Sequence, residues 1–337
     1  AFAMETLALH GGPKAKTVPY STGKRFDGNE LMYLKEALEQ NTLFYDFGKQ
    51  VKTACEAMRA YTGREYVVAC SSGSAAVHLG LIAAGIGPGD EVICTPNTDS
   101  GSILGIIEEG AVPVFCDCGT HLQPTPQSVA DAMTPRTKAV VVVHLAGYPA
   151  PVDAIVALCS KRGIPVVEDC AQAWGTKLNG QRVGTFGLAG CFSTNDFKHI
   201  STGDGGFVAL ADADCYRRVA NYADKGYDRV FKGERRCHNH GINYRMTELQ
   251  GAVARAQLER VDAITARFNE CGTHLQALLT QCPGAALVQA IPGAYATYWW
   301  TMLLPQSGQL TASRDELVTA LQAEGVGASG YGKYDLI

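Results

Sequence analysis

The sequence predicts an α/β protein with a mostly parallel sheet that is covered by helices on both faces. From Arg64 onward, short runs of apolar and β-branched residues alternate with segments of helical periodicity. These runs are apolar throughout, which is typical of strands buried on both faces of a parallel sheet. The chain has 337 residues, of which 46% are hydrophobic and 18% are charged, so it can bury a large core and is long enough for two domains.

Seven segments are expected to form the strands of this sheet, and helices are expected to connect several of them. A helix between two strands returns the chain to the starting edge of the sheet, as a parallel pair requires. The expected strands lie at residues 66–69, 91–95, 113–117, 138–145, 164–169, 189–194 and 205–210, and the expected helices at residues 74–84, 100–111, 126–133 and 153–163.

The character of the sequence changes in its last third. A long amphipathic helix is predicted over residues 245–270, and the segments YWWTMLLP and RDELVTALQAEG follow it. We therefore expect a large domain at residues 1–250, with an N-terminal arm, and a smaller C-terminal α+β domain at residues 251–337. The chain stops at YGKYDLI without obvious closure, so the smaller domain is expected to be incomplete.

Composition argues against several classes of protein. The formal charge of −4 is too mild for a nucleic-acid-binding surface. No apolar run approaches the roughly 18 residues that a membrane helix needs. The twelve cysteines are scattered without a C-x-x-C pair, which favours reduced thiols in a cytoplasmic protein. A zinc site built from Cys116, Cys118 and a distant histidine is the weaker alternative, and no metal is expected.

Polar residues cluster where the predicted strands end, which is where open α/β sheets bind ligands. The run SSGSAAVHLGL at residues 71–81 places Gly73 and Ser74 at the start of a helix, where backbone amides and the helix dipole attract an anion. The alternative is an ordinary helix cap. Glu168 and Asp169 end another strand, and a carboxylate there can pair with a protonated ring nitrogen or cap the next helix.

Lys198 lies between an apolar strand and a glycine-rich turn, five positions after Ser193. Lysine forms imines with carbonyl cofactors once burial or a neighbouring cation lowers its pKa. The alternative is a solvent-facing loop lysine. Asn243 and Arg245, just before the long helix, could bind an anion or could cap and form an ion pair.

In this order, the runs SSGSAA, HLAG, VVEDCAQAWG, FSTNDFKHISTGDGG and GINYRMTELQGA resemble the DegT/DnrJ/EryC1/StrS family of sugar aminotransferases. These are fold-type I enzymes that depend on pyridoxal 5′-phosphate (PLP). The resemblance covers nearly the whole chain from LALHGGPKA onward, and it includes the spacing of Lys198, 29 positions after Asp169. It implies a seven-stranded, mostly parallel sheet between helices in the large domain.

The resemblance also implies a role for each candidate residue. Lys198 would form the Schiff base with PLP, and Asp169 would pair with the pyridine nitrogen; these two are the expected catalytic residues. In the family, the residue at Asn243 reaches the phosphate of the neighbouring subunit's cofactor, so a homodimer with shared active sites is expected. The other expected cofactor-binding residues are Gly73, Ser74 and Ser193 at the phosphate and Gln172 on the side of the phenolic oxygen.

The implied reaction moves an amino group from L-glutamate or L-glutamine to a keto-sugar or to a keto-cyclitol. A nucleotide-linked form of the keto-sugar is expected. Pyridoxamine phosphate carries the amino group between the two halves of the reaction. A charged pyridine acts as an electron sink, and Lys198 is placed to move a proton. Two alternatives stay open: a PLP-dependent sugar dehydratase, although such relatives replace the lysine with histidine, and a non-catalytic PLP-binding regulator.

Two positions depart from the family pattern. Asp99 stands where an aromatic residue commonly stacks on the cofactor ring. A carboxylate cannot stack, so Asp99 is expected to contact the donor, the substrate or a water molecule within the cofactor site. Trp174 stands where histidine is frequent, and it is expected to supply the lost apolar surface.

Overall fold

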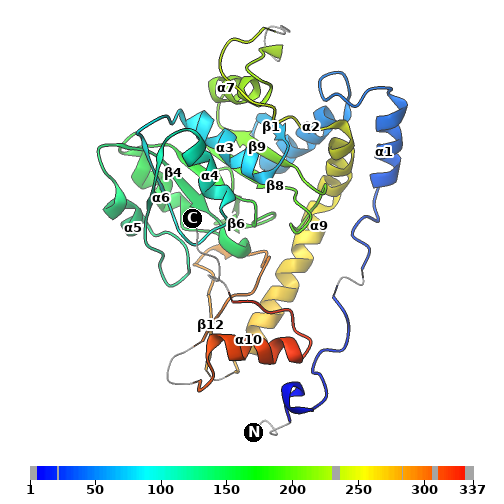
Figure 1. Cartoon of the computed structure of the whole chain (residues 1–337), viewed down its shortest axis with the longest axis vertical. Coiled ribbons are helices and arrows are strands. Elements are labelled where there is room, and N and C mark those ends of the chain that lie inside the picture. Colours follow the sequence, from blue (N-terminus) through cyan, green and yellow to red (C-terminus); the bar gives the residue numbers. More distant parts are fainter. Residues whose placement is uncertain (1–5, 21–22, 230–235, 283, 306–309, 331–337) are drawn as a thin grey trace. The chain divides into compact units, whose positions relative to one another are not determined.

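A computed structural model describes residues 6–20, 23–229, 236–282, 284–305 and 310–330 (Figure 1). By its internal contacts the chain forms two compact units. The larger unit comprises residues 28–275 and 288–302, and the smaller one comprises residues 1–27, 276–287 and 303–337. The segment at residues 288–302 thus groups with the larger unit, and a domain boundary at residue 250 stays a prediction.

The seven predicted strands form one sheet in the order β1-β9-β8-β5-β4-β2-β3, which confirms the predicted fold class. The neighbours from β8 through β3 are paired in parallel, whereas β9 runs antiparallel to both β8 and β1. The strands are β1 Tyr66–Cys70, β2 Glu91–Cys94, β3 Val112–Phe115, β4 Thr137–Val143, β5 Val166–Asp169, β8 Ala189–Ser193 and β9 Gly206–Leu210.

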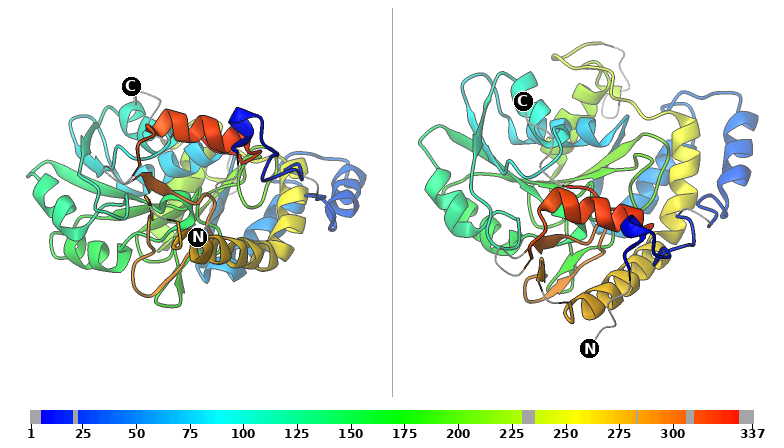
Figure 2. Two further views of the ribbon diagram at one scale, coloured as in Figure 1. Left: turned by 90° about the horizontal axis from the view of Figure 1, so that it is seen from below. Right: turned by 60° about the horizontal axis from the view of Figure 1, so that its bottom comes forward.

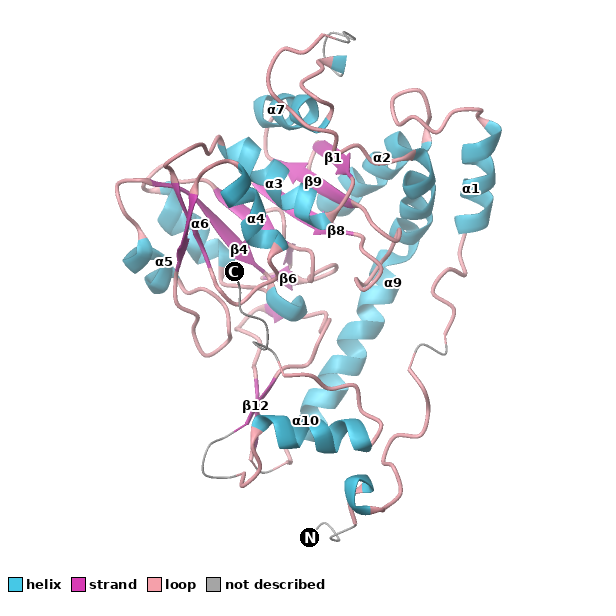
Figure 3. Ribbon diagram, in the orientation of Figure 1, coloured by secondary structure: helices cyan, strands magenta, loops and turns pink. Residues whose placement is uncertain are grey.

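Helices cover both faces of this sheet, as Figure 3 shows with helices in cyan and strands in magenta. One face packs against α3 (Gly73–Ala84), α4 (Gly101–Glu108) and α7 (Ala213–Ala223). The other face packs against α2 (Gln50–Thr62), α5 (Pro126–Ala132), α6 (Val152–Ser160) and α9 (Glu248–Leu279). Because the strands are buried on both faces, they are continuously apolar in sequence.

The long amphipathic helix is α9, a single helix of 32 residues that extends further than predicted (Figure 2). The larger unit also contains α1 (Glu30–Glu39), the short helix η2 (Leu145–Gly147) and a three-stranded sheet. That sheet consists of β6 (Lys177–Leu178), β7 (Gln181–Arg182) and β11 (Ala294–Tyr295).

The smaller unit has α+β character. The strands β10 (Ala285–Leu287) and β12 (Leu303–Pro305) pair antiparallel, and α10 (Arg314–Ala323) and η1 (Ala8–His10) belong to the same unit. Two backbone amides of the N-terminal segment donate to the carboxylate of Glu324, at 2.7 and 2.9 Å. This tie joins the first and last described segments of the chain within one unit.

All twelve cysteines are free thiols, and most of them are buried in the sheet and its covering helices. Cys116 and Cys118 form no zinc-ligand cluster with a histidine among the described residues. Within the described ranges, no helix is long and apolar enough to cross a membrane.

Candidate active site

A cavity of about 230 Å³ opens where the carboxyl ends of β5 and β8 meet the start of α3. Seven of the eight predicted site residues line it, although they come from five separate segments of the chain. The lining residues are Ser72, Gly73, Ser74, Val77, Asp99, Gly101, Ser102, Asp169, Ala171, Gln172, Ser193, Asn195, Lys198 and Asp204.

The start of α3 forms one wall of the cavity. Ser72 is the N-cap, since its Oγ accepts a hydrogen bond from the Ala75 amide at 3.1 Å. The cap is therefore provided by Ser72, and Ser74 at the second helical position faces the cavity. A Cβ atom at Gly73 would lie 2.5 Å from the Cβ of Ser193, so only glycine fits there. The positive end of the helix dipole faces this space, which suits an anion.

Asp169 ends β5 and is almost fully buried. Its Oδ2 accepts a hydrogen bond from Ser102 Oγ at 2.6 Å, and its Oδ1 accepts one from the Ala171 amide at 2.9 Å. Burial raises the pKa of Asp169, although these bonds and the charge of Lys198 oppose the rise. A cation bound against this carboxylate would therefore stabilise its charged form, which burial disfavours.

Lys198 lies in the turn after β8, and burial lowers the pKa of its amine. The carboxylates of Asp169 and Asp99 oppose this shift. Asp99 lines the cavity, and its Oδ1 also accepts a hydrogen bond from the Gly101 amide at 2.9 Å at the start of α4. A lysine with a lowered pKa has more of the neutral amine that attacks a carbonyl carbon.

Gln172 and Ser193 are held in place by backbone groups. The side-chain oxygen of Gln172 accepts a hydrogen bond from the Ala146 amide at 2.8 Å. Ala146 adopts a left-handed conformation with φ 54°, which is unfavourable for a residue with a side chain. Ser193 Oγ accepts a bond from the Asn195 amide at 3.2 Å. Both side chains thus have fixed positions at the cavity wall.

Asn243 does not line the cavity of its own chain. It is exposed and forms an isolated bridge with Asp224. The buried carboxylate of Asp224 binds Arg245 Nη1 at 2.6 Å and the Tyr45 hydroxyl at 2.7 Å, so this loop is well anchored. The contact of Asn243 with a neighbouring subunit's cofactor stays a prediction.

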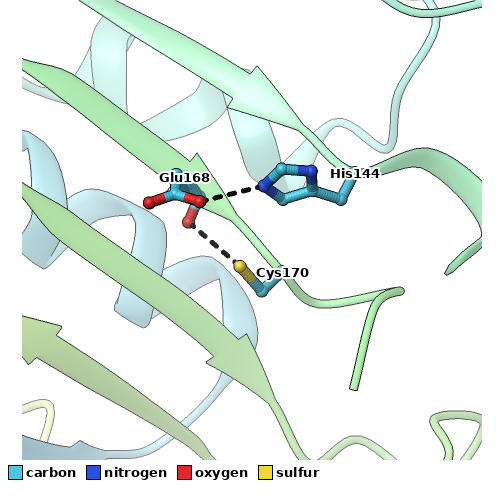
Figure 4. Close-up of side chains that lie close together, drawn as sticks. All are labelled: His144, Glu168 and Cys170. Carbon is cyan, nitrogen blue, oxygen red and sulfur yellow. Dashed lines mark hydrogen bonds and ion pairs between the residues drawn. The ribbon is translucent and has the colours of Figure 1, made fainter. Parts of the chain in front are cut away.

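Glu168, His144 and Cys170 lie within reach of a common metal ion behind the cavity wall (Figure 4). Their hydrogen bonds argue for a structural role. His144 Nδ1 accepts from the Ala150 amide at 3.1 Å, so its Nε2 carries the proton and donates to Glu168 Oε2 at 3.1 Å. Burial and the neighbouring carboxylates raise the pKa of Cys170 well above its usual value, which keeps a thiol and not a thiolate.

The amides of residues 184, 186 and 187 also donate to Glu168, at 2.6 to 2.7 Å. Arg64 Nη2 donates to the carbonyl groups of Thr185 and Gly187 in the same turn. The second acidic residue of the Glu168–Asp169 pair therefore faces the cavity, whereas the first one holds a turn.

The structure corrects one prediction and adds two residues. Trp174 supplies no surface to the cavity; it is fully buried between Tyr61 and Phe192, because the turn after Gln172 directs it into the core. Ser102 was missed, since only the folded helix places it beside Asp169. Trp299 was also missed: its ring lies against Lys198, and the signal was the WW pair in YWWTMLLP.

Comparisons with known proteins show which family the chain belongs to. The DegT/DnrJ/EryC1/StrS aminotransferase family matches residues 24–334. The chain is 36% identical to UDP-N-acetyl-3-dehydro-alpha-D-glucosamine 3-aminotransferase of Acidithiobacillus ferrooxidans, over 98% of this chain and 84% of that protein. It is 33% identical to GDP-perosamine synthase of Caulobacter vibrioides, over 90% of this chain and 81% of that protein.

Among solved structures, DesV of S. venezuelae in complex with a ketimine intermediate superposes with a TM-score of 0.81. The two sequences are 30% identical, and the match covers 89% of this chain and 78% of DesV. These matches confirm the predicted fold and enzyme class. The chain belongs to the DegT/DnrJ/EryC1/StrS family and is a PLP-dependent aminotransferase.

Proposed function

We propose that this enzyme transfers an amino group from L-glutamate or L-glutamine to a nucleotide-linked keto-sugar, with PLP bound in the cavity beside Lys198. One observation carries the proposal. Lys198, Asp169 and the start of α3 line the same cavity, so an amine, a carboxylate and an anion-binding helix end converge. Two relatives that match most of the chain are named for UDP-linked and GDP-linked sugars, which favours a nucleotide-linked acceptor.

The residues present fit PLP. Gly73 leaves a space beside Ser193 that a larger residue would fill, and Ser74 and the α3 dipole suit the phosphate. The buried Asp169 carboxylate suits a protonated pyridine nitrogen, which would lower its raised pKa. When bound, PLP supplies a carbonyl carbon that accepts the amino group and a ring that stores the electron pair.

The side chains have separable tasks. Among the described residues that line the cavity, Lys198 carries the only amine. Its Nζ would anchor the cofactor covalently and, once released, move a proton at the reacting carbon. Asp169 would hold the ring nitrogen in its charged form, and Ser102 orients Asp169 from behind. Asp99 occupies the wall where many relatives of this family would have an aromatic side chain, so it would contact the donor or the acceptor.

The experiment that tests this function uses absorbance. Purified protein incubated with PLP should develop a visible Schiff-base band, and L-glutamate or L-glutamine should bleach it. The protein loaded with pyridoxamine phosphate is then mixed with UDP-N-acetyl-3-dehydro-glucosamine, GDP-4-keto-6-deoxymannose or a free keto-cyclitol. We expect the band to return with a nucleotide-linked acceptor. Return only with the cyclitol would contradict the acceptor class, and a deoxygenated product would indicate dehydration instead of transfer.

We also propose a homodimer in which Asn243 of each subunit completes the phosphate site of the other. The exposed position of Asn243, outside its own chain's cavity, supports this arrangement. Lys198→Ala and Asn243→Ala should then complement each other after mixing and re-association. Random mixing makes about half of the dimers mixed, and one of their two sites is intact, so roughly a quarter of wild-type activity should return. Recovery no greater than the sum of the separate variants would contradict shared sites.

A further inference from the structure

The indole of Trp299 lies against the Lys198 amine, although the two residues are far apart in the sequence. Lys198 Nζ is 4.0 Å from the centroid of the Trp299 ring. Trp299 Nε1–H also donates a hydrogen bond to the Phe197 carbonyl at 2.7 Å. One side chain therefore contacts both the end of the lysine and the backbone immediately before it.

Trp300 covers the other side of the same ring. The centroids of Trp299 and Trp300 are 4.1 Å apart, and their planes differ by 18°. An amine and a second indole cannot both occupy the same face of one ring at such distances. Trp299 therefore lies between Lys198 and Trp300, and the second indole limits its movement away from the lysine.

The backbone of this segment is tied to the turn at Leu145–Gly147. The Thr297 amide donates to the Gly147 carbonyl at 2.9 Å, and the Trp300 amide donates to the Ala146 carbonyl at 3.4 Å. The hydroxyl groups of Thr297 and Thr176 are 2.7 Å apart. These bonds fix the backbone on both sides of Trp299, so its ring forms a rigid surface.

Trp299 is not among the residues that line the cavity. Its effect on the reaction must therefore pass through Lys198. We propose that Trp299 is the positioning residue of Lys198, which holds the lysine side chain and its Nζ in the orientation from which it bonds PLP. This inference rests on the proposed function, because it assumes that Lys198 is the anchoring amine.

The physical reason is the freedom of the lysine side chain. A lysine side chain has a flexible stem of four carbons joined by rotatable bonds, and it loses much conformational entropy when its amine is held at one point. The Trp299 ring packs against the end of the Lys198 side chain, with Nζ 4.0 Å from the ring centroid, and this contact restricts the rotamers of the lysine in both its charged and its neutral form. Without the ring, we expect Lys198 to bond PLP about tenfold more slowly, because the freed side chain must lose its conformational entropy when the bond forms.

The test measures how fast PLP forms a Schiff base with Lys198 as a function of pH. At high pH the amine is neutral in every variant, so the plateau of the rate reports orientation and is separate from any change in pKa. Trp299→Leu should lower the plateau about tenfold, whereas Trp299→Phe, which keeps a flat ring packed against the lysine, should stay within about threefold of wild type. Trp300→Leu is the matched control; it keeps an apolar side chain behind Trp299 and should also stay within about threefold.

A second measurement separates positioning from a general structural effect. Non-covalent PLP affinity is compared between Lys198→Ala and Lys198→Ala/Trp299→Leu, and we expect the two affinities to agree. A wild-type plateau in Trp299→Leu would overturn the proposal. So would a PLP affinity that is about tenfold weaker in the double variant than in Lys198→Ala. A wild-type protein whose borohydride-trapped adduct is absent from Lys198 would instead contradict the proposed function itself.

Discussion

Glu168 and Asp169 are neighbouring carboxylates at the end of the same strand, and they serve opposite purposes. Successive residues of a strand point to opposite faces of the sheet. Asp169 therefore meets Ser102 and the cavity, whereas Glu168 meets His144 and the turn at residues 184–187. Two residues with the same chemistry thus belong to different regions, one at the cavity in which we propose that PLP binds and one in the network that holds a turn.

The difference lies in how completely each carboxylate is bonded. Glu168 accepts four hydrogen bonds, three of them from backbone amides and one from His144. Asp169 has two within the protein, and burial raises its pKa. A buried carboxylate with few donors costs stability unless another positive group is supplied. Asp169 therefore has too few donors unless a ligand supplies a positive group, whereas the hydrogen bonds of Glu168 are complete within the protein.

The largest effect is expected on the cavity side. Lys198→Ala should abolish the covalent PLP adduct and turnover, because no other amine among the described residues lines the cavity. The melting temperature should change by less than about 3 °C, as expected for a change of about 1 kcal/mol or less in a chain of this size. Borohydride reduction and mass spectrometry measure the adduct. A trapped adduct on a different lysine would move the anchor elsewhere.

Asp169→Asn should slow turnover by two or more orders of magnitude, since the neutral amide no longer holds the ring nitrogen charged. Without PLP the same variant should melt higher than wild type at pH 7. The folded-state pKa of Asp169 is raised, so its ionisation opposes folding as pH rises above the ordinary value of 3.8. The difference in melting temperature between the variant and wild type should disappear below about pH 4, where the Asp169 carboxyl is neutral as well. Calorimetry across pH measures this difference, and a lower melting temperature of the variant at pH 7 would show that the Asp169 carboxylate stabilises the ligand-free fold.

Glu168→Gln should lower the stability of the protein and leave its PLP affinity nearly unchanged. The side-chain oxygen of the glutamine can accept hydrogen bonds from two of the four donors, but its NH₂ group then faces the other two donors and leaves them without an acceptor. We expect a loss of about 3 kcal/mol in the free energy of unfolding, which corresponds to a melting temperature lower by about 5–10 °C. PLP affinity at a temperature where the variant is folded should remain close to wild type. A variant with wild-type melting and weak PLP binding would assign Glu168 to the cavity instead.

Ser102→Ala is expected to have the smallest effect. It removes the hydroxyl that donates to Asp169 Oδ2 at 2.6 Å and leaves the Ala171 amide in place. A hydrogen bond to a charged group contributes about 1.5–3 kcal/mol, so PLP should bind roughly tenfold more weakly. Titration monitored by protein fluorescence measures the affinity. Unchanged binding would show that the Ala171 amide alone holds Asp169.

Much of this arrangement is predictable from sequence because it depends on local patterns. The apolar runs predict all seven strands, and the family runs place Lys198, Asp169 and the Gly73–Ser74 pair at one edge of the sheet. The antiparallel direction of β9 is not visible in an apolar run, because burial on both faces gives the same pattern in either direction.

The remaining features depend on contacts between distant segments. Trp299 reaches Lys198 through bonds to the Leu145–Gly147 turn, and no local pattern indicates that pairing. Trp174 shows the converse: it follows Gln172 by two positions, yet a turn directs it into the core. A side chain's neighbour in sequence does not fix the direction in which it points when the backbone is irregular.

The pairing of β1 has a consequence for synthesis on the ribosome. β1 is hydrogen-bonded to β9 along its length, and the Ser71 amide beyond it donates to the Tyr244 carbonyl. The loop that leads into α3 is therefore bounded by residues made much later than itself. Closing such a long segment is entropically costly and slow. A growing chain consequently lacks the complete loop before α3 until Tyr244 has emerged, so we expect PLP to bind only after that segment has been synthesised.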